Sequence, residues 1–210
     1  MMISAKNLHF SYNTATQFIF PDINCNAGEV LIISGKSGTG KTTLLHLLGG
    51  ILKPISGQII IDYTEINTLN EKQLDKFRGN NIGIVFQKAN FISSLNVLEN
   101  LELASWLATK NKQTEKAKKI LSQLDLSSHL HKKPTELSVG QQQRVSIARA
   151  IINEPKLILA DEPTSNLDDE NCFNVATLLS ETAKAINAAL IIVTHDSRLK
   201  DKFPNHIQLV

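Results

Sequence analysis

The stretch Leu31–Gly50, LIISGKSGTGKTTLLHLLGG, places an apolar run, a glycine-rich turn and a second apolar segment in immediate succession. Residues 35–42 match the pattern G-x-x-x-x-G-K-[ST] at every fixed position. Glycines let such a turn curl until successive backbone N–H groups point at one anion, and the positive end of the following helix adds to the attraction. A chance match is expected about one time in a hundred at ordinary glycine usage. We therefore interpret the stretch as a buried strand, a phosphate-binding loop and a helix.

Two side chains of this loop have specific expected roles. Lys41 is placed to reach the outer phosphates of a nucleoside triphosphate, and the Thr42 hydroxyl is placed to coordinate Mg²⁺. The sequence therefore predicts a site for ATP and Mg²⁺, with the phosphates held by Gly35, Lys36, Ser37, Gly38, Thr39, Gly40, Lys41, Thr42 and Thr43.

A second apolar run ends in two carboxylates. The segment 156–163, KLILADEP, predicts a buried strand followed by Asp161 and Glu162. A carboxylate there can hold Mg²⁺ and its water shell, which is the role expected of Asp161. Glu162 can act as the general base that polarises the water attacking the γ-phosphate. A lone Asp-Glu pair more often serves as a favourable charge at a helix start, but the phosphate-binding loop in the same chain favours the catalytic interpretation.

Further apolar runs indicate an α/β fold. Several of them are followed at once by polar residues and a helical pattern, which is typical of a parallel sheet with ligand groups at its carboxyl edge. Alternating apolar positions in residues 1–30 predict antiparallel strands. The predicted buried strands are Val30–Ile33, Ile59–Ile61, Ile82–Phe86, Leu157–Ala160 and Leu190–Val193.

Residues 88–154 depart from this alternation of apolar strands and helical patterns and contain no convincing strand. Their apolar spacing predicts three helices, Val97–Lys110, Gln113–Leu124 and Ser138–Asn153, the last ending before Pro155. We therefore predict one domain over residues 1–210. In it, a P-loop NTPase core (1–87 and 155–210) with an N-terminal antiparallel β part carries an inserted α-helical subdomain (88–154).

Charge and cysteine content exclude some classes of partner and compartment. The 22 Lys and Arg residues nearly balance the 20 Asp and Glu residues, which leaves +2 and gives no reason to expect nucleic acid as a partner. Cys25 and Cys172 form no C-x-x-C pattern, which fits a reducing cytoplasm. No window approaches ~18 uninterrupted apolar residues. We therefore expect any association with a membrane to depend on a partner.

A second candidate anion site lies about a hundred residues after the first. The segment 137–144, LSVGQQQR, has Ser138 and Gln141 at the spacing of a capping box. On these residues alone, a capped helix with no ligand is the better interpretation. His129 and His131 lie just before this segment, and we predict that they are surface residues, because too few further ligands surround them for a metal site.

The motifs together resemble those of the ATP-binding subunits of ABC transporters, over nearly the whole chain. Leu137–Gln141 resembles their signature motif, Ser165–Asp168 the D-loop, Gln87 the Q-loop glutamine, Tyr12 the aromatic of the A-loop and His195 the switch histidine. The resemblance implies a RecA-like core and two subunits packed head to tail around two ATP molecules. In this arrangement each signature helix faces the P-loop of the other subunit.

The resemblance also implies roles for single residues. Ser138, Gly140 and Gln141 would hold the γ-phosphate of the partner's ATP, and Tyr12 would stack on adenine, with Phe10 as the competing aromatic. Gln87 would reach Mg²⁺ or the attacking water, and His195 would contact the γ-phosphate. From the residues alone, Tyr12 could be an ordinary strand aromatic and Gln87 a polar strand end. A lone histidine such as His195 is more often a core histidine.

Val139 departs from the family pattern, which has glycine at this position of the signature. A β-branched side chain disfavours positive φ. Either Val139 has negative φ and faces away from the nucleotide, or the signature is impaired. We favour the first alternative because Ser138, Gly140 and Gln141 are retained.

The expected function is that of an ATP-hydrolysing subunit that drives a separate membrane permease and lies on the inner face of the cell membrane through that partner. The segments 137–144 and 77–101 resemble the lipoprotein-releasing and macrolide-exporting branch. One alternative is an ATPase that regulates a membrane-bound cell-wall or division complex without transport. Another is a soluble ABC ATPase of DNA repair or translation, although those chains carry long insertions or two fused units.

Overall fold

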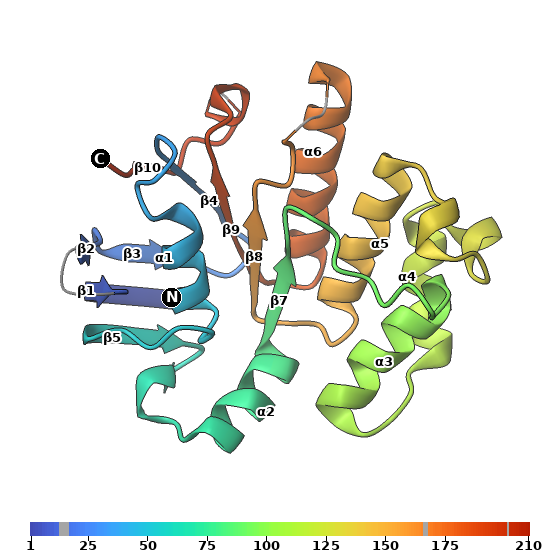
Figure 1. Cartoon of the computed structure of the whole chain (residues 1–210), viewed down its shortest axis with the longest axis horizontal. Helices are drawn as coiled ribbons and strands as arrows, with labels where there is room; N and C mark the ends of the chain where they lie inside the picture. The colour runs from blue at the N-terminus through green and yellow to red at the C-terminus, as the bar shows by residue number, and fades with distance from the viewer. Residues whose placement is uncertain (13–16, 166–167, 201) are drawn as a thin grey trace.

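The computed structural model describes residues 1–12, 17–165, 168–200 and 202–210, which form two sheets with helices packed between and around them (Figure 1). One sheet is parallel, as the buried apolar runs predict, and has the strand order β10-β4-β9-β8-β7. Its strands are β4 (Val30–Ser34), β7 (Ile82–Val85), β8 (Leu157–Asp161), β9 (Ala189–Thr194) and β10 (His206–Gln208).

The second sheet is antiparallel and consists mainly of the N-terminal segment, as predicted. Strand β1 lies at its centre and pairs with β2, β3 and β5. Its strands are β1 (Ile3–Ser11), β2 (Gln17–Ile19), β3 (Ile23–Cys25), β5 (Ser56–Ile61) and β6 (Thr64–Glu65).

Both faces of the parallel sheet are covered, because its strands alternate apolar side chains between two cores. In β9, Leu190 and Ile192 pack into one core, whereas Ile191 and Val193 pack into the other. Helix α1 (Lys41–Leu48) lies between the parallel and antiparallel sheets and buries its leucines in the second core. Helices α5 (Val139–Ile151) and α6 (Asp169–Ala185) contribute to the first core.

The remaining helices lie along the region predicted to be helical and just before it. Helices α3 (Val97–Thr109) and α4 (Thr114–Gln123) pack with α5, and α2 (Glu71–Asn81) precedes β7. Predicted and observed ends of α3, α4 and α5 differ by at most two residues. Most of the differences are cap residues outside the helices, and the largest is at the end of α5, where Ile152 is the cap and the predicted end, Asn153, lies one residue beyond it. Short 3₁₀ turns cover Ile66–Thr68, Ser127–His129, Pro134–Glu136 and Ser197–Leu199.

Val139 adopts the first of its two expected conformations. It occupies the first turn of α5 and is not among the residues with positive φ. Its side chain is 70% exposed. The missing signature glycine therefore causes no backbone strain.

Helices of sufficient length and apolarity to cross a membrane are absent from the described part of the chain.

Gly83 sets the distance between β7 and α5. A Cβ added to Gly83 would lie 2.3 Å from the carbonyl oxygen of Ala150 in α5 and 3.1 Å from Pro155. Gly83→Ala should therefore lower the free energy of unfolding by about 3 kcal/mol, the upper end of the usual cost of overpacking, as measured by urea denaturation.

Gly140→Ala is the matched control for Gly83→Ala. A Cβ at Gly140 meets no atom within 4 Å, and Gly140 lies in the first turn of α5, so Gly140→Ala should leave the free energy of unfolding unchanged or raise it by up to about 1 kcal/mol. Equal stability of the two variants would mean that α5 does not approach β7 this closely.

Candidate active site

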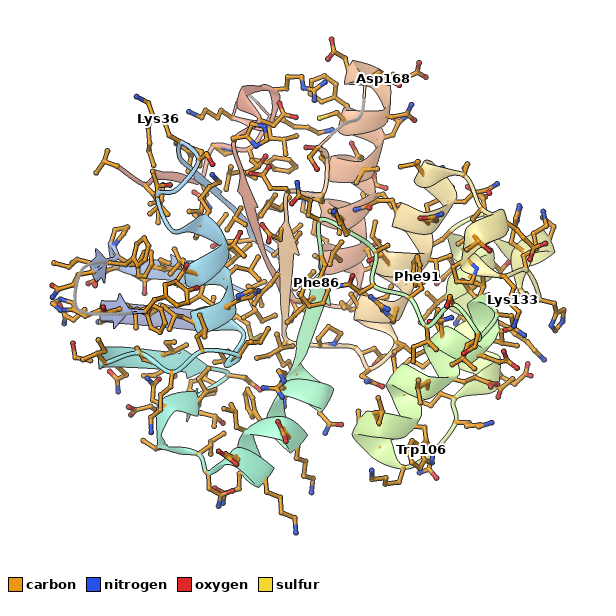
Figure 2. All side chains as sticks on the ribbon, in the orientation of Figure 1. Lys36, Phe86, Phe91, Trp106, Lys133 and Asp168 are labelled. Carbon is orange, nitrogen blue, oxygen red and sulfur yellow. The ribbon has the colours of Figure 1, made fainter. Side chains whose placement is uncertain are left out.

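A cavity of about 850 Å³ lies at the carboxyl edge of the parallel sheet, where β4, β8 and β9 end. This edge is the expected ligand position in an open α/β sheet, and the volume suits a nucleotide. Lys36 lies on the loop between β4 and α1, and its side chain extends outward from this edge of the molecule (Figure 2). The cavity is lined by Phe18, Ser34, Gly35, Lys36, Ser37, Gly38, Gly40, Lys41, Thr42, Thr43, Gln87, Glu162, His195, Lys200 and Gln208.

The phosphate-binding loop has the backbone that its glycines predict. Gly38 and Gly40 both have φ of 86°, in the left-handed region that other residues avoid. The Lys41 ammonium donates to the carbonyl oxygens of Gly35 (2.9 Å) and Lys36 (3.1 Å). A phosphate in this loop would offer Lys41 a charged acceptor, which forms a stronger hydrogen bond than these carbonyls do.

Thr42 and Asp161, the two residues predicted at the metal position, contact each other. The Thr42 hydroxyl lies 3.2 Å from Asp161 Oδ2. Burial raises the pKa of Asp161, and the hydrogen bond from Thr42 partly opposes this effect. A cation would compensate the buried carboxylate. Among the described residues no three His, Cys, Asp or Glu side chains gather as a metal site. This donor set fits Mg²⁺ with a nucleotide, since Mg²⁺ usually takes one or two carboxylates together with phosphates.

Glu162 is held by the end of β9. His195 Nδ1 donates to Glu162 Oε1 at 2.8 Å, and Thr194 Oγ1 donates to Oε2 at 3.0 Å. Lys41 Nζ lies 3.9 Å from Oε1. Glu162 has φ of 46°, a costly conformation for a residue with a long side chain. The buried carboxylate is therefore fixed in direction and lies at the cavity wall beside a cation.

His195 was predicted to contact the γ-phosphate. Its Nδ1 faces Glu162, and 65% of its side chain is exposed. His195 lines the cavity, so the exposed part of the ring is accessible to a bound nucleotide.

The aromatic residues near the cavity differ in accessibility. Tyr12 is 58% exposed, and its hydroxyl lies 3.1 Å from Thr43 Oγ1, but it is not among the cavity-lining residues. Phe10, the predicted competitor, is only 8% exposed and cannot offer a ring face to a base. Phe18 lines the cavity and packs edge-on to Tyr12.

Gln87 lines the cavity and lies near the segment that follows Glu162. Its Nε2 is 3.5 Å from Ser165 Oγ, and that hydroxyl donates to the backbone oxygen of Glu162 at 2.9 Å. The predicted D-loop lies partly outside the described residues, which omit Asn166 and Leu167. Asp168, at the start of α6, caps that helix by accepting from the backbone N–H of Asn171 (Figure 2).

The signature residues lie away from the cavity of their own chain. Ser138, Gly140 and Gln141 are not among its lining residues. Ser138 and Gln141 form the predicted capping box, with bonds of 3.3 and 3.0 Å. Gln141 Nε2 also donates to His129 Nε2 at 3.1 Å. The prediction that His129 is a surface residue is thus incomplete, because the ring is half-buried and supports the signature helix.

Sequence reasoning missed five residues at or beside the cavity. Ser34, which lines the cavity, is the last residue of β4 and directly precedes the glycine pattern. Thr194, directly before His195, could have been recognised by its hydroxyl at a strand end. Phe18 could have been recognised as an aromatic near Tyr12. Gln208 has no local signal, because only the pairing of β10 with β4 brings it to the cavity, and Lys200 follows the short turn after His195.

Comparison with known proteins agrees with this geometry. The family model described as ABC transporter matches residues 21–165. The lipoprotein-releasing system ATP-binding protein LolD of Buchnera aphidicola subsp. Schizaphis graminum is 42% identical over 179 residues, which cover 84% of this chain and 78% of that protein. LolD of Legionella pneumophila (strain Paris) is 39% identical over 209 residues, covering 96% and 92%.

Solved structures agree as well. A structure described as a dimeric bacterial ABC transporter cassette, MJ0796, superposes with a TM-score of 0.87 at 34% identity, covering 99% of this chain and 94% of that one. The match extends over the antiparallel sheet, the parallel core and the helices between them. The chain therefore belongs to the ABC transporter family, as an ATP-binding cassette that hydrolyses ATP.

Proposed function

We propose that this chain is the ATPase subunit of a lipoprotein-releasing transporter, closes as a homodimer around two ATP molecules, and thereby drives a separate membrane permease. The lipoprotein class is supported by the similarity to LolD proteins over nearly the full chain. The hydrolytic mechanism is supported by one observation above all. The buried Glu162 carboxylate lies at the cavity wall between Lys41 and His195.

In the proposed reaction Glu162 is the general base. It accepts a proton from the attacking water as the oxygen of that water bonds to the γ-phosphorus, and ADP leaves. Thr194 and His195 hold the carboxylate in direction, and Lys41 with the loop N–H groups stabilises the charge on the phosphate oxygens. Thr42 and Asp161 would hold Mg²⁺, with Gln87 close by. When bound, this ion supplies further positive charge at the phosphates.

The second half of the site is proposed to come from the partner subunit. Ser138, Gly140 and Gln141 begin a helix whose N-terminal N–H groups suit an anion. The space around Gly140 is open, and Val139 faces solvent. A relative's structure is described as the dimeric post-hydrolysis state of MJ0796 bound to ADP and Pi, which supports the arrangement. ATP bridging two helix ends would favour the closed dimer, and hydrolysis would weaken it.

The permease is proposed to dock on the helical subdomain, residues 88–154, and on the loop after Gln87, which would place the chain at the cytoplasmic face of the membrane. Tyr12 is proposed to stack on adenine, because it is 58% exposed and packs edge-on against Phe18, which lines the cavity.

Glu162→Gln should reduce ATP turnover by about 10²–10⁴-fold, the usual contribution of a general base, while leaving ATP binding intact. The side chain keeps its size and remains within reach of Thr194. Light scattering should then detect a stable dimer with ATP and Mg²⁺ and a monomer with ADP. A monomer at saturating ATP would contradict the proposed dimer.

Ser138→Arg should abolish turnover without weakening nucleotide binding to the monomer, because Ser138 does not line its own cavity. Lys41→Ala should also be inactive, because it disables the P-loop of its own chain and leaves the signature intact. A mixture of the two variants should recover activity that neither has alone, since a mixed dimer contains one intact P-loop facing one intact signature. No recovery would mean that the signature acts within its own chain. Ser138→Ala is the control for the loss of the helix cap, which costs about 1 kcal/mol.

The permease can be identified by pull-down from detergent-solubilised membranes with tagged Glu162→Gln chain, ATP and Mg²⁺, followed by mass spectrometry. A permease with a large extracytoplasmic domain is the expected result. Recovery of a cell-wall hydrolase regulator instead would favour the alternative in which ATP hydrolysis controls a membrane complex without transport.

A further inference from the structure

Asp196, which follows His195, accepts hydrogen bonds from three separate parts of the chain. Thr164 Oγ1 lies 3.2 Å and Cys172 Sγ 3.4 Å from Asp196 Oδ2. Arg198 donates through its backbone N (3.0 Å), Nε (2.8 Å) and NH2 (2.7 Å). The side chain of Asp196 is only 10% exposed. Hydrogen bonds from Arg198 hold the pKa of Asp196 far below its usual range, so the acceptor is a carboxylate at neutral pH.

Cys172 belongs to helix α6, and Arg198 adds a second contact with that helix. Its NH1 donates to Asp169 in the first turn of that helix, near the labelled Asp168 (Figure 2). Thr164 and Asp169 flank the segment that follows Glu162 and Pro163. Asp196 and Arg198 therefore bind both sides of this segment to the turn that carries His195.

A short chain of hydrogen bonds leads from Asp196 to Glu162. The backbone N–H of Asp196 donates to Thr194 Oγ1 at 3.0 Å, and that hydroxyl donates to Glu162 Oε2 at 3.0 Å. Thr194 and Thr164 are both fully buried. Water cannot replace these bonds without opening the core. Each of them therefore constrains the relative positions of the two groups it joins more strongly than an exposed hydrogen bond would.

We propose that Asp196 is a positioning residue for ATP hydrolysis. It fixes the loop after β8 against the loop after β9, so that Glu162 and His195 keep the mutual orientation required for attack on the γ-phosphate. Asp196 touches no reacting atom and acts through Thr194 and His195. This inference rests on the general-base role proposed for Glu162.

The test is Asp196→Asn in the full-length chain. The carboxamide keeps the shape but turns an NH₂ group toward donors, which disturbs the bonds to Thr164 and Arg198. The kcat for ATP should fall at least about tenfold, which corresponds to about 1.4 kcal/mol in the activation free energy. The Kd for a fluorescent ATP analogue should stay within twofold. A general loss of structure would instead weaken nucleotide binding and turnover together.

Two further variants keep the test decisive if Asp196→Asn folds poorly. Thr164→Val removes one bond at nearly constant volume and should lower kcat by a smaller factor with unchanged Kd. Asp75→Asn is the matched control, because it breaks an exposed Arg78–Asp75 ion pair in α2, and it should behave like the unmodified chain.

Wild-type kcat in folded Asp196→Asn, or equal losses in kcat and in nucleotide affinity, would overturn the positioning role. The Glu162→Gln variant separates this failure from failure of the proposed mechanism. If Glu162→Gln stalls turnover while Asp196→Asn does not, only the positioning role is wrong. If Glu162→Gln turns over ATP normally, the general-base assignment fails first.

Discussion

Burial of both faces of the parallel sheet is the constraint on which the rest of this structure depends. Strands β4, β8 and β9 are apolar along nearly their whole length, so they need a helical layer on one side and α1 with the antiparallel sheet on the other. Parallel strands end at a common edge. Ser34, Asp161 and Thr194 therefore finish side by side, and the loops that follow them converge on one cavity.

Charged groups at that edge are stable because they hold one another. Lys41, Asp161 and Glu162 are each less than one tenth exposed, and each has a partner: loop carbonyls, the Thr42 hydroxyl, or the Thr194 and His195 donors. An unpartnered charge would be costly at this depth. The same contacts that compensate for the burial of these groups also orient them toward the cavity.

Local strain is concentrated beside the proposed general base. Glu162 has positive φ, which costs on the order of 1–3 kcal/mol, and its backbone N–H bonds to Val193 at 2.9 Å. Thr194 at the end of β9 and His195 in the loop after it compensate with bonds to the Glu162 side chain. Two adjacent loops thus determine each other's conformation. This mutual dependence is why Asp196, one residue beyond His195, is expected to matter for the orientation of Glu162.

The sequence by itself determined the local parts of the protein. The glycine pattern of residues 35–42, the apolar runs and the Ser138 cap of α5 depend on neighbours within a few residues, and the structure has each of them where the pattern indicates. Local sequence patterns, together with the common edge at which parallel strands end, also predict which residues meet at one cavity: Lys41, Thr42, Asp161 and Glu162. The burial of Phe10, the contacts of Lys200 and Gln208 with the cavity, and the bond between His129 and Gln141 depend on segments far apart in the chain. No local pattern encodes the distance between such segments, so only the packed tertiary structure decided them.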